Sequence, residues 1–257
     1  MTTPTPLLSP IASPSPTPLP TPDLPPFLAE FWRDVQADFI KDDRWLWLLK
    51  GLGTTLEITL FATLLGLAIG LALALVKVTQ YNGGKVGPLG WIADLYLTVI
   101  RGTPSVVQLL IIYFVIFGSV DVPKVLVAVI AFGINSGAYM AEIIRGGILS
   151  IDKGQMEASR SLGLDYATSM RTVVIPQATK NVLPAMGNEF ITLLKETAIA
   201  GYIAVEDLTK AGDLIRAQTY DAFLPLIVVA AIYLAIVMVL TSLLKRVEAR
   251  LRRSDHR

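Results

Sequence analysis

Residues 52–76, LGTTLEITLFATLLGLAIGLALALV, contain a single charged residue, Glu57, and a few threonines among apolar side chains. Helical residues rise about 1.5 Å each, so this run exceeds the hydrocarbon core of a bilayer, which is about 30 Å thick. We therefore predict that 52–76 forms a transmembrane helix and that the chain is an integral membrane protein.

The composition of the 257 residues agrees with this prediction. Hydrophobic residues make up 53% and charged residues only 17%, whereas soluble domains carry about 25% charged residues. There is no cysteine, and His256 is the one histidine. Disulfides, metal clusters of thiolates or histidines, and catalytic triads with histidine are therefore excluded. The net charge of +1 argues against a general nucleic-acid-binding surface.

Further apolar segments predict more spans. Residues 105–118 are too short to span alone, but joined to the amphipathic stretch from Trp91 they predict one long helix, bent at Gly102 and Pro104. Residues 122–141 and 222–244 predict a third and a fifth span. We therefore expect an all-α integral membrane fold with about five transmembrane helices.

The fourth span, 182–206, has a different character. Lipid tolerates its polar side chains only where they face protein or water. These side chains are Asn188, Glu189, Thr192, Lys195, Glu196 and Thr197.

Charge predicts the orientation of these spans. Residues 245–257 hold six Lys and Arg against two acids, and residues 1–50 hold four against six. Under the positive-inside rule, the basic C-terminus is cytoplasmic, together with the connections 77–90 and 145–181. Five spans then place the N-terminus outside, whereas an even number would place it inside.

The sequence divides into four parts. Residues 1–28 include ten of the sixteen prolines up to residue 26 and predict a disordered tail, with an SH3-type ligand as the alternative. Residues 29–50 form an amphipathic interfacial segment, 51–245 the transmembrane domain, and 246–257 a basic cytoplasmic tail. The long inner connection 145–181 is either a partner-docking element or an interfacial packing element.

This connection resembles the EAA loop of bacterial ABC importer permeases. The family pattern is Glu-Ala-Ala, three residues, Gly, nine residues, and Ile-x-Leu-Pro. Glu157-Ala158-Ser159, Gly163 and Val173-Val174-Ile175-Pro176 keep this spacing, with Ser159, Val173 and Ile175 as modest departures. Further stretches resemble the polar amino acid branch of that family. They are Arg101-Gly102-Thr103-Pro104 with Gln108, Gly137-Ala138-Tyr139 leading to Glu142 and Arg145-Gly146, and Asn188-Glu189 with Lys195. The resemblance covers residues 45–245.

The resemblance implies a permease subunit of an ATP-driven amino acid importer in the bacterial inner membrane. Two permease chains, alike or merely similar, form the pathway, and an extracytoplasmic solute-binding protein delivers the amino acid. The EAA loop carries a cytoplasmic coupling helix, so Glu157, Ala158 and Gly163 contact an ATPase subunit dimer. That partner binds ATP and Mg. This chain lacks a phosphate-binding loop, because Gly83-Gly84-Lys85 is followed by Val86. We therefore expect a transport subunit that is not itself an enzyme and holds no cofactor.

Helical spacing suggests which residues line the pathway. Asn135, Tyr139 and Glu142 share one face, as do Asn188, Thr192 and Lys195, with Glu189 and Glu196 beside them. Carboxylates and Lys195 suit the two charges of an amino acid. The alternative is that these groups pair with one another, and for Glu142 an interfacial or structural role is favoured. Glu57 either contacts substrate or reaches the outer interface, and Glu196 is a candidate for selectivity toward cationic amino acids.

Arg101 has three interpretations from its position. It lies at the inner interface, binds lipid phosphate, or pairs with a carboxylate near Gly102, Thr103 and Pro104. The recurrence of this stretch in the family favours a structural bend.

Two other classes of function stay open at this point. An ion- or proton-coupled secondary carrier would use the membrane carboxylates, but such carriers show paired repeats, which we do not find. A membrane enzyme or scaffold would need a convergent acid/base set. The sequence does not identify the amino acid.

Overall fold

The computed structural model describes residues 25–252, and this part of the chain is helical without strands. The N-terminal segment holds α1 (Pro26–Val35), a π-helical turn η1 (Gln36–Ile40) and a short turn η2 (Lys41–Asp43). The remaining elements are α2 (Trp45–Tyr81), α3 (Pro88–Gly102), α4 (Ser105–Ile111), η3 (Ile112–Ile116), α5 (Lys124–Leu149), α6 (Lys153–Ser161), α7 (Tyr166–Ser169), η4 (Met170–Val174), α8 (Ile175–Glu196), η5 (Thr197–Ile203), α9 (Leu208–Thr219) and α10 (Phe223–Arg252).

Helices α2 and α5 form the centre of the fold, because small residues let their backbones approach closely. A Cβ atom on Gly70 of α2 would come within 2.5 Å of the Cβ of Met140 on α5. Nearer the N-terminal ends of the two helices, Ile58, Ala62, Val127 and Phe132 are buried in one apolar cluster. The long apolar run that predicts the first span is therefore also the helix on which the others pack.

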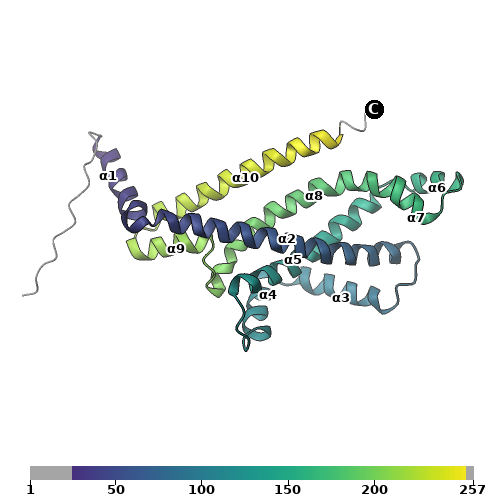
Figure 1. Cartoon of the computed structure of the whole chain (residues 1–257), viewed down its shortest axis with the longest axis horizontal. Helices are drawn as coiled ribbons and strands as arrows, with labels where there is room; N and C mark the ends of the chain where they lie inside the picture. Colours follow the sequence, from purple (N-terminus) through teal and green to yellow (C-terminus); the bar gives the residue numbers. More distant parts are fainter. Residues whose placement is uncertain (1–24, 253–257) are drawn as a thin grey trace, which may run out of the picture.

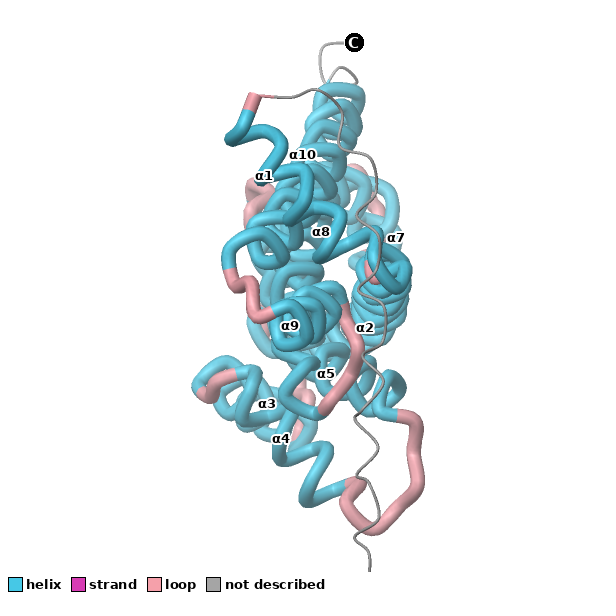
Figure 2. The backbone as a smooth tube through the Cα atoms, turned by 90° about the vertical axis from the view of Figure 1, so that its left-hand side faces the viewer, coloured by secondary structure: helices cyan, strands magenta, loops and turns pink. Residues whose placement is uncertain are grey.

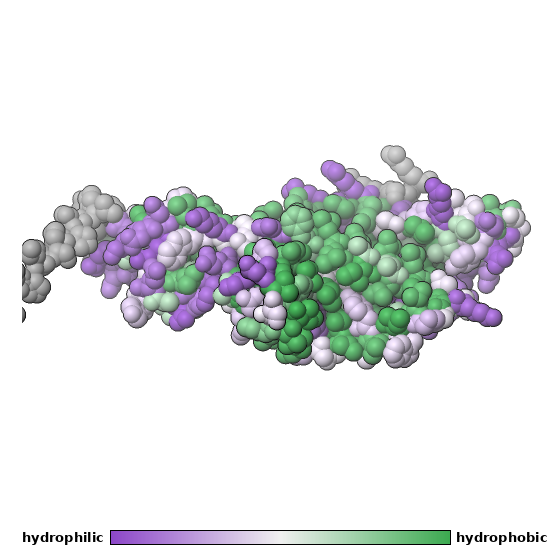
Figure 3. Space-filling model, turned by 60° about the horizontal axis from the view of Figure 1, so that its bottom comes forward, coloured by the Kyte–Doolittle hydropathy of each residue, from purple (hydrophilic) through white to green (hydrophobic). Residues whose placement is uncertain are grey.

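The molecule is elongated, and its two ends differ (Figure 1). Helices α1 and α9 lie at one end, and α6 and α7 lie at the other. Across the long axis, α10 and α8 lie on one side of α2 and α5, with α3 and α4 on the opposite side (Figure 2). Hydrophobic residues cover the middle of the face in Figure 3, and hydrophilic residues gather at the α1 end. Such an apolar belt is what a bilayer-embedded surface requires.

Three of the described helices are long and apolar enough to cross a membrane, namely α2, α5 and α10. The pair α3 and α4–η3 also passes this test, but its two arms are bent by 109°. The prediction of one long bent helix over 91–118 is therefore corrected to a sharply broken pair. Helix α8 exists, but its polar residues keep it outside this set, so the count of five spans and the orientation of the termini stay predictions.

Several expected boundaries shift in the structure. Helix α2 begins at Trp45, so the last residues of the predicted interfacial segment 29–50 belong to this helix. Helix α1 begins at Pro26, which leaves residues 1–24 of the proline-rich tail outside the described residues. Helix α5 continues to Leu149 and α8 starts at Ile175, so the inner connection is shorter than 145–181. The predicted basic tail begins inside α10, and residues 253–257 lie outside the described part.

Helix α9 was not expected at all. Asp207 caps its N-terminus by accepting hydrogen bonds from the backbone N–H groups of Thr209 and Lys210, both at 3.0 Å. Leu208, Ala211 and Ile215 are buried against α2 and α10. Capping and spacing of this kind identify a short amphipathic helix, and both signals are present in the sequence.

Candidate functional site

Helices α6 and α7 form a projecting turn at one end of the molecule. Asp152 begins α6 by accepting a hydrogen bond from the N–H of Gly154 at 2.6 Å, and Asp165 begins α7 by accepting one from the N–H of Thr168 at 2.7 Å. Hydrogen bonds from the side chain and backbone of Thr168 lower the pKa of Asp165. Both short helices therefore start at charged caps, which fix their ends without help from a core.

Gly163 supplies the turn between these helices. Its φ is +87°, a left-handed conformation that a side chain disfavours. The N–H of Gly163 donates to Arg160 O at 2.9 Å, and the N–H of Leu164 donates to Ser159 O at 3.3 Å. These two bonds form a Schellman motif, which ends α6.

The surface of this turn is open. The expected docking residues Glu157, Ala158 and Gly163 are all exposed, and Leu162 beside them is 84% exposed. The structure therefore brings the three expected residues onto one projecting element, although their partner is not tested by it.

The same turn is tied to the end of α2. Asn82 Nδ2 donates to the hydroxyl of Tyr166 at 3.0 Å, and Lys153 Nζ lies 5.8 Å from the centre of the Tyr81 ring. A hollow of about 600 Å³ lies between these groups and the start of η4. The turn of α6 and α7 therefore contacts the C-terminal end of α2, the central helix of the fold.

The break between α3 and α4 is held by a buried amide network. Gln108 Nε2 donates to Ile100 O at 2.7 Å and to Thr103 Oγ1 at 2.8 Å. Gln108 Oε1 accepts from Asn135 Nδ2 at 2.9 Å. Asn135 is 4% exposed, so in this conformation the residue expected in the pathway serves the bend. Gly102, Thr103 and Pro104 lie at this break, and Thr103 joins the network, while the bend role expected for the four residues from Arg101 to Pro104 stays a prediction.

An ion cluster lies beside the same break. Glu142 pairs with Arg145 at 2.6 Å and with Arg101 at 3.6 Å, and Lys77 pairs with Asp94 at 2.6 Å. These five residues line a hollow of about 550 Å³. The structural role that the sequence favours for Glu142 agrees with its two ion pairs. Tyr139, which was expected in the pathway, is 38% exposed and lies under Arg101, 6.0 Å from the guanidinium carbon to the ring centre.

Helix α8 carries an open polar face. Asn188, Thr192 and Lys195 are exposed along one side, as their spacing predicts. Glu189 and Glu196 are partly buried next to them, and the hydroxyl of Ser136 on α5 donates to Glu189 Oε1 at 3.1 Å. Ser136, which was not expected in the site, therefore joins α5 to Glu189 of α8, whereas the face of Asn135, Tyr139 and Glu142 lies at the break between α3 and α4. In the sequence, the feature that could have indicated Ser136 is a small hydroxyl side chain next to Asn135 in a largely apolar helix.

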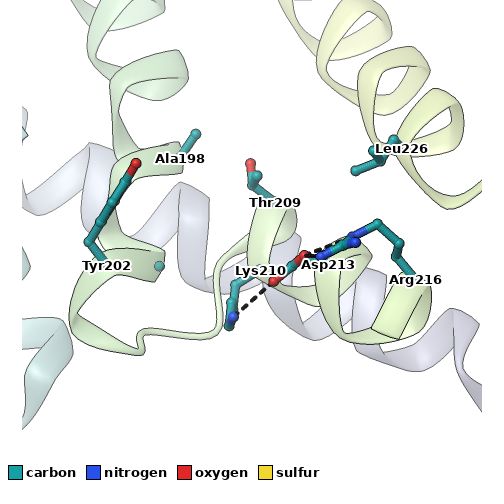
Figure 4. A pocket seen from close by; sticks show the side chains of 8 residues that line it. Ala198, Tyr202, Thr209, Lys210, Asp213, Arg216 and Leu226 are labelled. Carbon is teal, nitrogen blue, oxygen red and sulfur yellow. Dashed lines mark hydrogen bonds and ion pairs between the residues drawn. The ribbon is translucent and has the colours of Figure 1, made fainter. Parts of the chain in front are cut away.

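A further hollow of about 430 Å³ lies between η5, α9 and α10 (Figure 4). Asp213 pairs with Lys210 at 2.9 Å and with Arg216 at 2.6 Å, so the three charges on α9 satisfy one another. These ion pairs lower the pKa of Asp213. Glu57, the charged residue of the first span, is exposed on α2 and lies outside all these groups.

Comparisons with known proteins identify the family of this chain. A family model described as "Binding-protein-dependent transport system inner membrane component" matches residues 66–253. The arginine transport system permease protein ArtQ of Bacillus subtilis (strain 168) is 41% identical over 210 residues, which cover 81% of this chain and 94% of that relative. The glutamine transport system permease protein GlnP of Escherichia coli (strain K12) is 41% identical over 170 residues, which cover 63% and 78%.

A solved structure gives the same result. The crystal structure of an amino acid ABC transporter with histidines matches with a TM-score of 0.75 and 44% sequence identity, covering 82% of this chain and 98% of that one. The α6–α7 turn and the apolar helices that carry it lie mostly within the matched family region. The chain therefore belongs to the family of binding-protein-dependent transport system inner membrane components, and its relatives in that family are amino acid permeases of ABC transporters.

Proposed function

We propose that this chain is the transmembrane permease subunit of an ATP-driven amino acid importer in a bacterial inner membrane. The observation that carries the proposal is the polar face of α8, where Asn188, Thr192 and Lys195 are exposed within a largely apolar bundle. Lipid disfavours such a face, whereas a water-filled pathway accommodates it. The names of the relatives supply the cargo class, because they transport arginine and glutamine.

A second permease chain, identical or similar, completes the pathway opposite this face. An α-amino acid presents an ammonium and a carboxylate. Glu189 and Glu196 are the acceptors for the ammonium, and Lys195 is the donor for the carboxylate, with Asn188 and Thr192 as neutral partners. Membrane lipid covers the exposed apolar side chains of α2, α3 and α10.

The energy for transport comes from ATP bound by a partner subunit. In this proposal, the exposed turn around Glu157, Ala158 and Gly163 docks on an ABC ATPase subunit dimer, which binds ATP and Mg. Closure of that dimer moves α6 and α7, and the contacts from Asn82 and Tyr81 transmit the movement to α2. The chain itself is a transport subunit without an ATPase site, and an extracytoplasmic solute-binding protein delivers the amino acid on the opposite side.

Reconstitution tests this assignment. The chain is purified with the subunits that accompany it, placed in liposomes and assayed for amino-acid-stimulated ATP hydrolysis and uptake. We expect an ATPase subunit to copurify and vanadate to block uptake. The alternative is an ion- or proton-coupled secondary amino acid carrier. Uptake by the chain alone, driven by a proton gradient and insensitive to vanadate, would establish that alternative and reject the importer.

A further inference from the structure

A pocket lies between the N-terminal segment and the end of α9, opposite to the α6–α7 end of the molecule (Figure 1). Its volume is about 320 Å³, near the lower end of the range of about 300–1,000 Å³ for small-molecule sites. Its charged lining residues are Asp34, Asp38, Lys41, Arg44 and Asp221. The amide of Gln218 and the hydroxyl of Thr219, at the end of α9, also line the pocket. Most of these residues precede the part that matches the family model, which begins at residue 66.

Arg44 links two parts of the pocket wall through its guanidinium group. Arg44 Nη1 donates to Ala37 O at 2.7 Å, and Nη2 pairs with Asp42 Oδ2 at 3.0 Å. Asp42 and Asp43 adopt φ values of +57° and +52°, so the chain reverses sharply before α2. Phe39 anchors the segment in the apolar cluster that includes Leu208 and Ile215 of α9.

Two buried polar atoms at this pocket have no partner within the described part of the chain. Asp38 is 3% exposed; its side chain has hydrogen-bond contacts with Thr219 and Asp221, while its Oδ2 has no donor among the described residues. Arg44 is 8% exposed, and its Nε donates none. Buried polar atoms are nearly always paired in folded proteins, so each requires an explanation. Asp38 Oδ2 is a hydrogen-bond acceptor, and Arg44 Nε is a hydrogen-bond donor.

The charges decide which ligand fits. Asp42 already neutralises Arg44, which leaves the carboxylates of Asp34, Asp38 and Asp221 opposed by Lys41 alone. Burial, and then the neighbouring Asp221, raise the pKa of Asp38. The described carboxylates do not form a cluster suited to a metal ion. A larger organic cation that also carries an anionic group therefore matches both the excess of acid and the free donor.

We propose that this pocket is a binding site for a free cationic α-amino acid, such as arginine, outside the translocation pathway. Its α-ammonium donates to Asp38 Oδ2, its carboxylate accepts from Arg44 Nε, and its cationic side chain lies against Asp34 and Asp221. The site holds α1 and η1 onto α9, so occupancy stabilises this end of the molecule. The proposal does not require the transport function to be correct, because it concerns binding alone.

Calorimetric titration of the purified full chain in nanodiscs with L-arginine tests the site. We expect a binding component that weakens at least tenfold in Asp38→Asn. Two analogues test the two partners without mutation. Agmatine lacks the carboxylate for Arg44, and N-acetylarginine lacks the ammonium for Asp38, so both should bind at least tenfold more weakly.

Two control variants separate this site from its surroundings. Asp43→Asn removes an exposed carboxylate of the same segment that does not line the pocket, and it should leave the component intact. Glu189→Gln alters the pathway and should also leave it intact. Loss of all arginine binding in Glu189→Gln, or full binding in Asp38→Asn, would overturn the proposal.

Hydrogen exchange of the unmodified chain provides a test that does not depend on folding of a variant. Saturating arginine should slow exchange in residues 34–44 and 218–221. Unchanged exchange there would mean that water alone satisfies Asp38 and Arg44, and the site would be rejected. A failed importer assay with this protection retained would reject the transport proposal only.

Discussion

Gly163 shows how one backbone conformation shapes the docking turn. Its φ of +87° and the two Schellman hydrogen bonds end α6 and redirect the chain into α7. A residue with a Cβ atom in this conformation costs about 1–2 kcal/mol. No neighbouring atom lies within 4 Å of the place where a Cβ would lie, so the cost comes from the backbone and not from a clash. The position of this glycine was predictable because its pattern depends on sequence spacing alone.

Replacing Gly163 should uncouple the ATPase from the amino acid. We expect Gly163→Ala to lower amino-acid-stimulated ATP hydrolysis about 5–30-fold, the effect of 1–2 kcal/mol on a two-state equilibrium. Gly163→Asn should have a milder effect, because asparagine tolerates this conformation. Gly163→Asp and Gly163→Arg should abolish stimulation while the chain remains inserted. The measurement is ATPase activity of the reconstituted complex.

The matched control for this series is Gly53→Ala, at a helical glycine with nothing within 4 Å. It should leave stimulation unchanged. Normal stimulation in both Gly163→Ala and Gly163→Asp would remove the docking role from this turn.

Asp38 presents the opposite case, a residue whose importance was not visible in the sequence. It occurs in an acidic amphipathic segment, where such side chains usually face solvent. Its burial depends on α9, which begins about 170 residues later in the chain and was itself not predicted. Only the packing of two distant segments buries this carboxylate with its Oδ2 lacking a donor.

Asp38→Asn should stabilise the protein when no ligand is present. Removing a buried charge that lies beside Asp221 and whose Oδ2 has no donor relieves about 1–3 kcal/mol of desolvation. Because the pKa of Asp38 is raised above its ordinary value of 3.8, the folded state binds this proton more tightly than the unfolded chain. Protonation thus adds stability below that ordinary pKa, and this contribution is lost as the pH rises through the raised pKa.

Thermal unfolding at several pH values measures this effect. The unfolding temperature of Asp38→Asn should exceed that of the unmodified chain by the largest amount at pH 7. The difference should shrink as the pH falls toward 3.8. Asp43→Asn, which alters an exposed neighbour, should follow the unmodified protein at every pH. Equal unfolding temperatures for Asp38→Asn and the unmodified chain at pH 7 would contradict the unpaired burial of this carboxylate.

At the scale of elements, the break between α3 and α4 was predictable in position but not in size. Gly102 and Pro104 indicate a bend, because proline disfavours helix in the residue before it. The angle of 109° depends on Gln108 and on its contact with Asn135 of α5. That contact joins residues 27 positions apart, and helical spacing contains no information about it.

Gln108→Ala should therefore loosen the broken pair. The change leaves the carbonyl of Ile100 and the amide of Asn135 without their partner, and each unsatisfied buried group costs about 1–3 kcal/mol. We expect a lower unfolding temperature and a broader distance distribution between spin labels on α3 and α4. The chain has no cysteine, so pairs of introduced cysteines label without background.

Gln177→Ala is the control for this element. Gln177 of α8 donates one hydrogen bond, to Val173 O in the adjoining η4 at 3.0 Å, and makes none to α3 or α4. The spin-label distribution between α3 and α4 should stay narrow in that variant. A narrow distribution in Gln108→Ala would show that the bend does not depend on this amide.

For the whole molecule, hydropathy predicted an apolar bundle with polar ends, and the surface in Figure 3 agrees. The sequence could not separate side chains that serve the bundle from those left open. Asn135 and Glu189 both occur in helices with polar neighbours. Asn135 is buried in the bend, whereas Glu189 lies beside the open face of α8. Helical spacing assigns residues to a face, but the packing of the neighbouring helices decides whether that face is covered.

Thr192 and Leu64 test whether the open face of α8 meets water. Both side chains are exposed in the isolated chain, Thr192 on the polar face and Leu64, at 54% exposure, on the apolar surface of α2. Maleimides react with the thiolate, which forms in water and is suppressed in hydrocarbon. In the membrane-embedded complex, a water-soluble maleimide should therefore label Thr192→Cys at least tenfold faster than Leu64→Cys. The transported amino acid should slow the labelling of Thr192→Cys, because it occupies the same face. Equal labelling of the two variants, or a Thr192→Cys variant that stays unreactive in every transport state, would remove this face from the pathway.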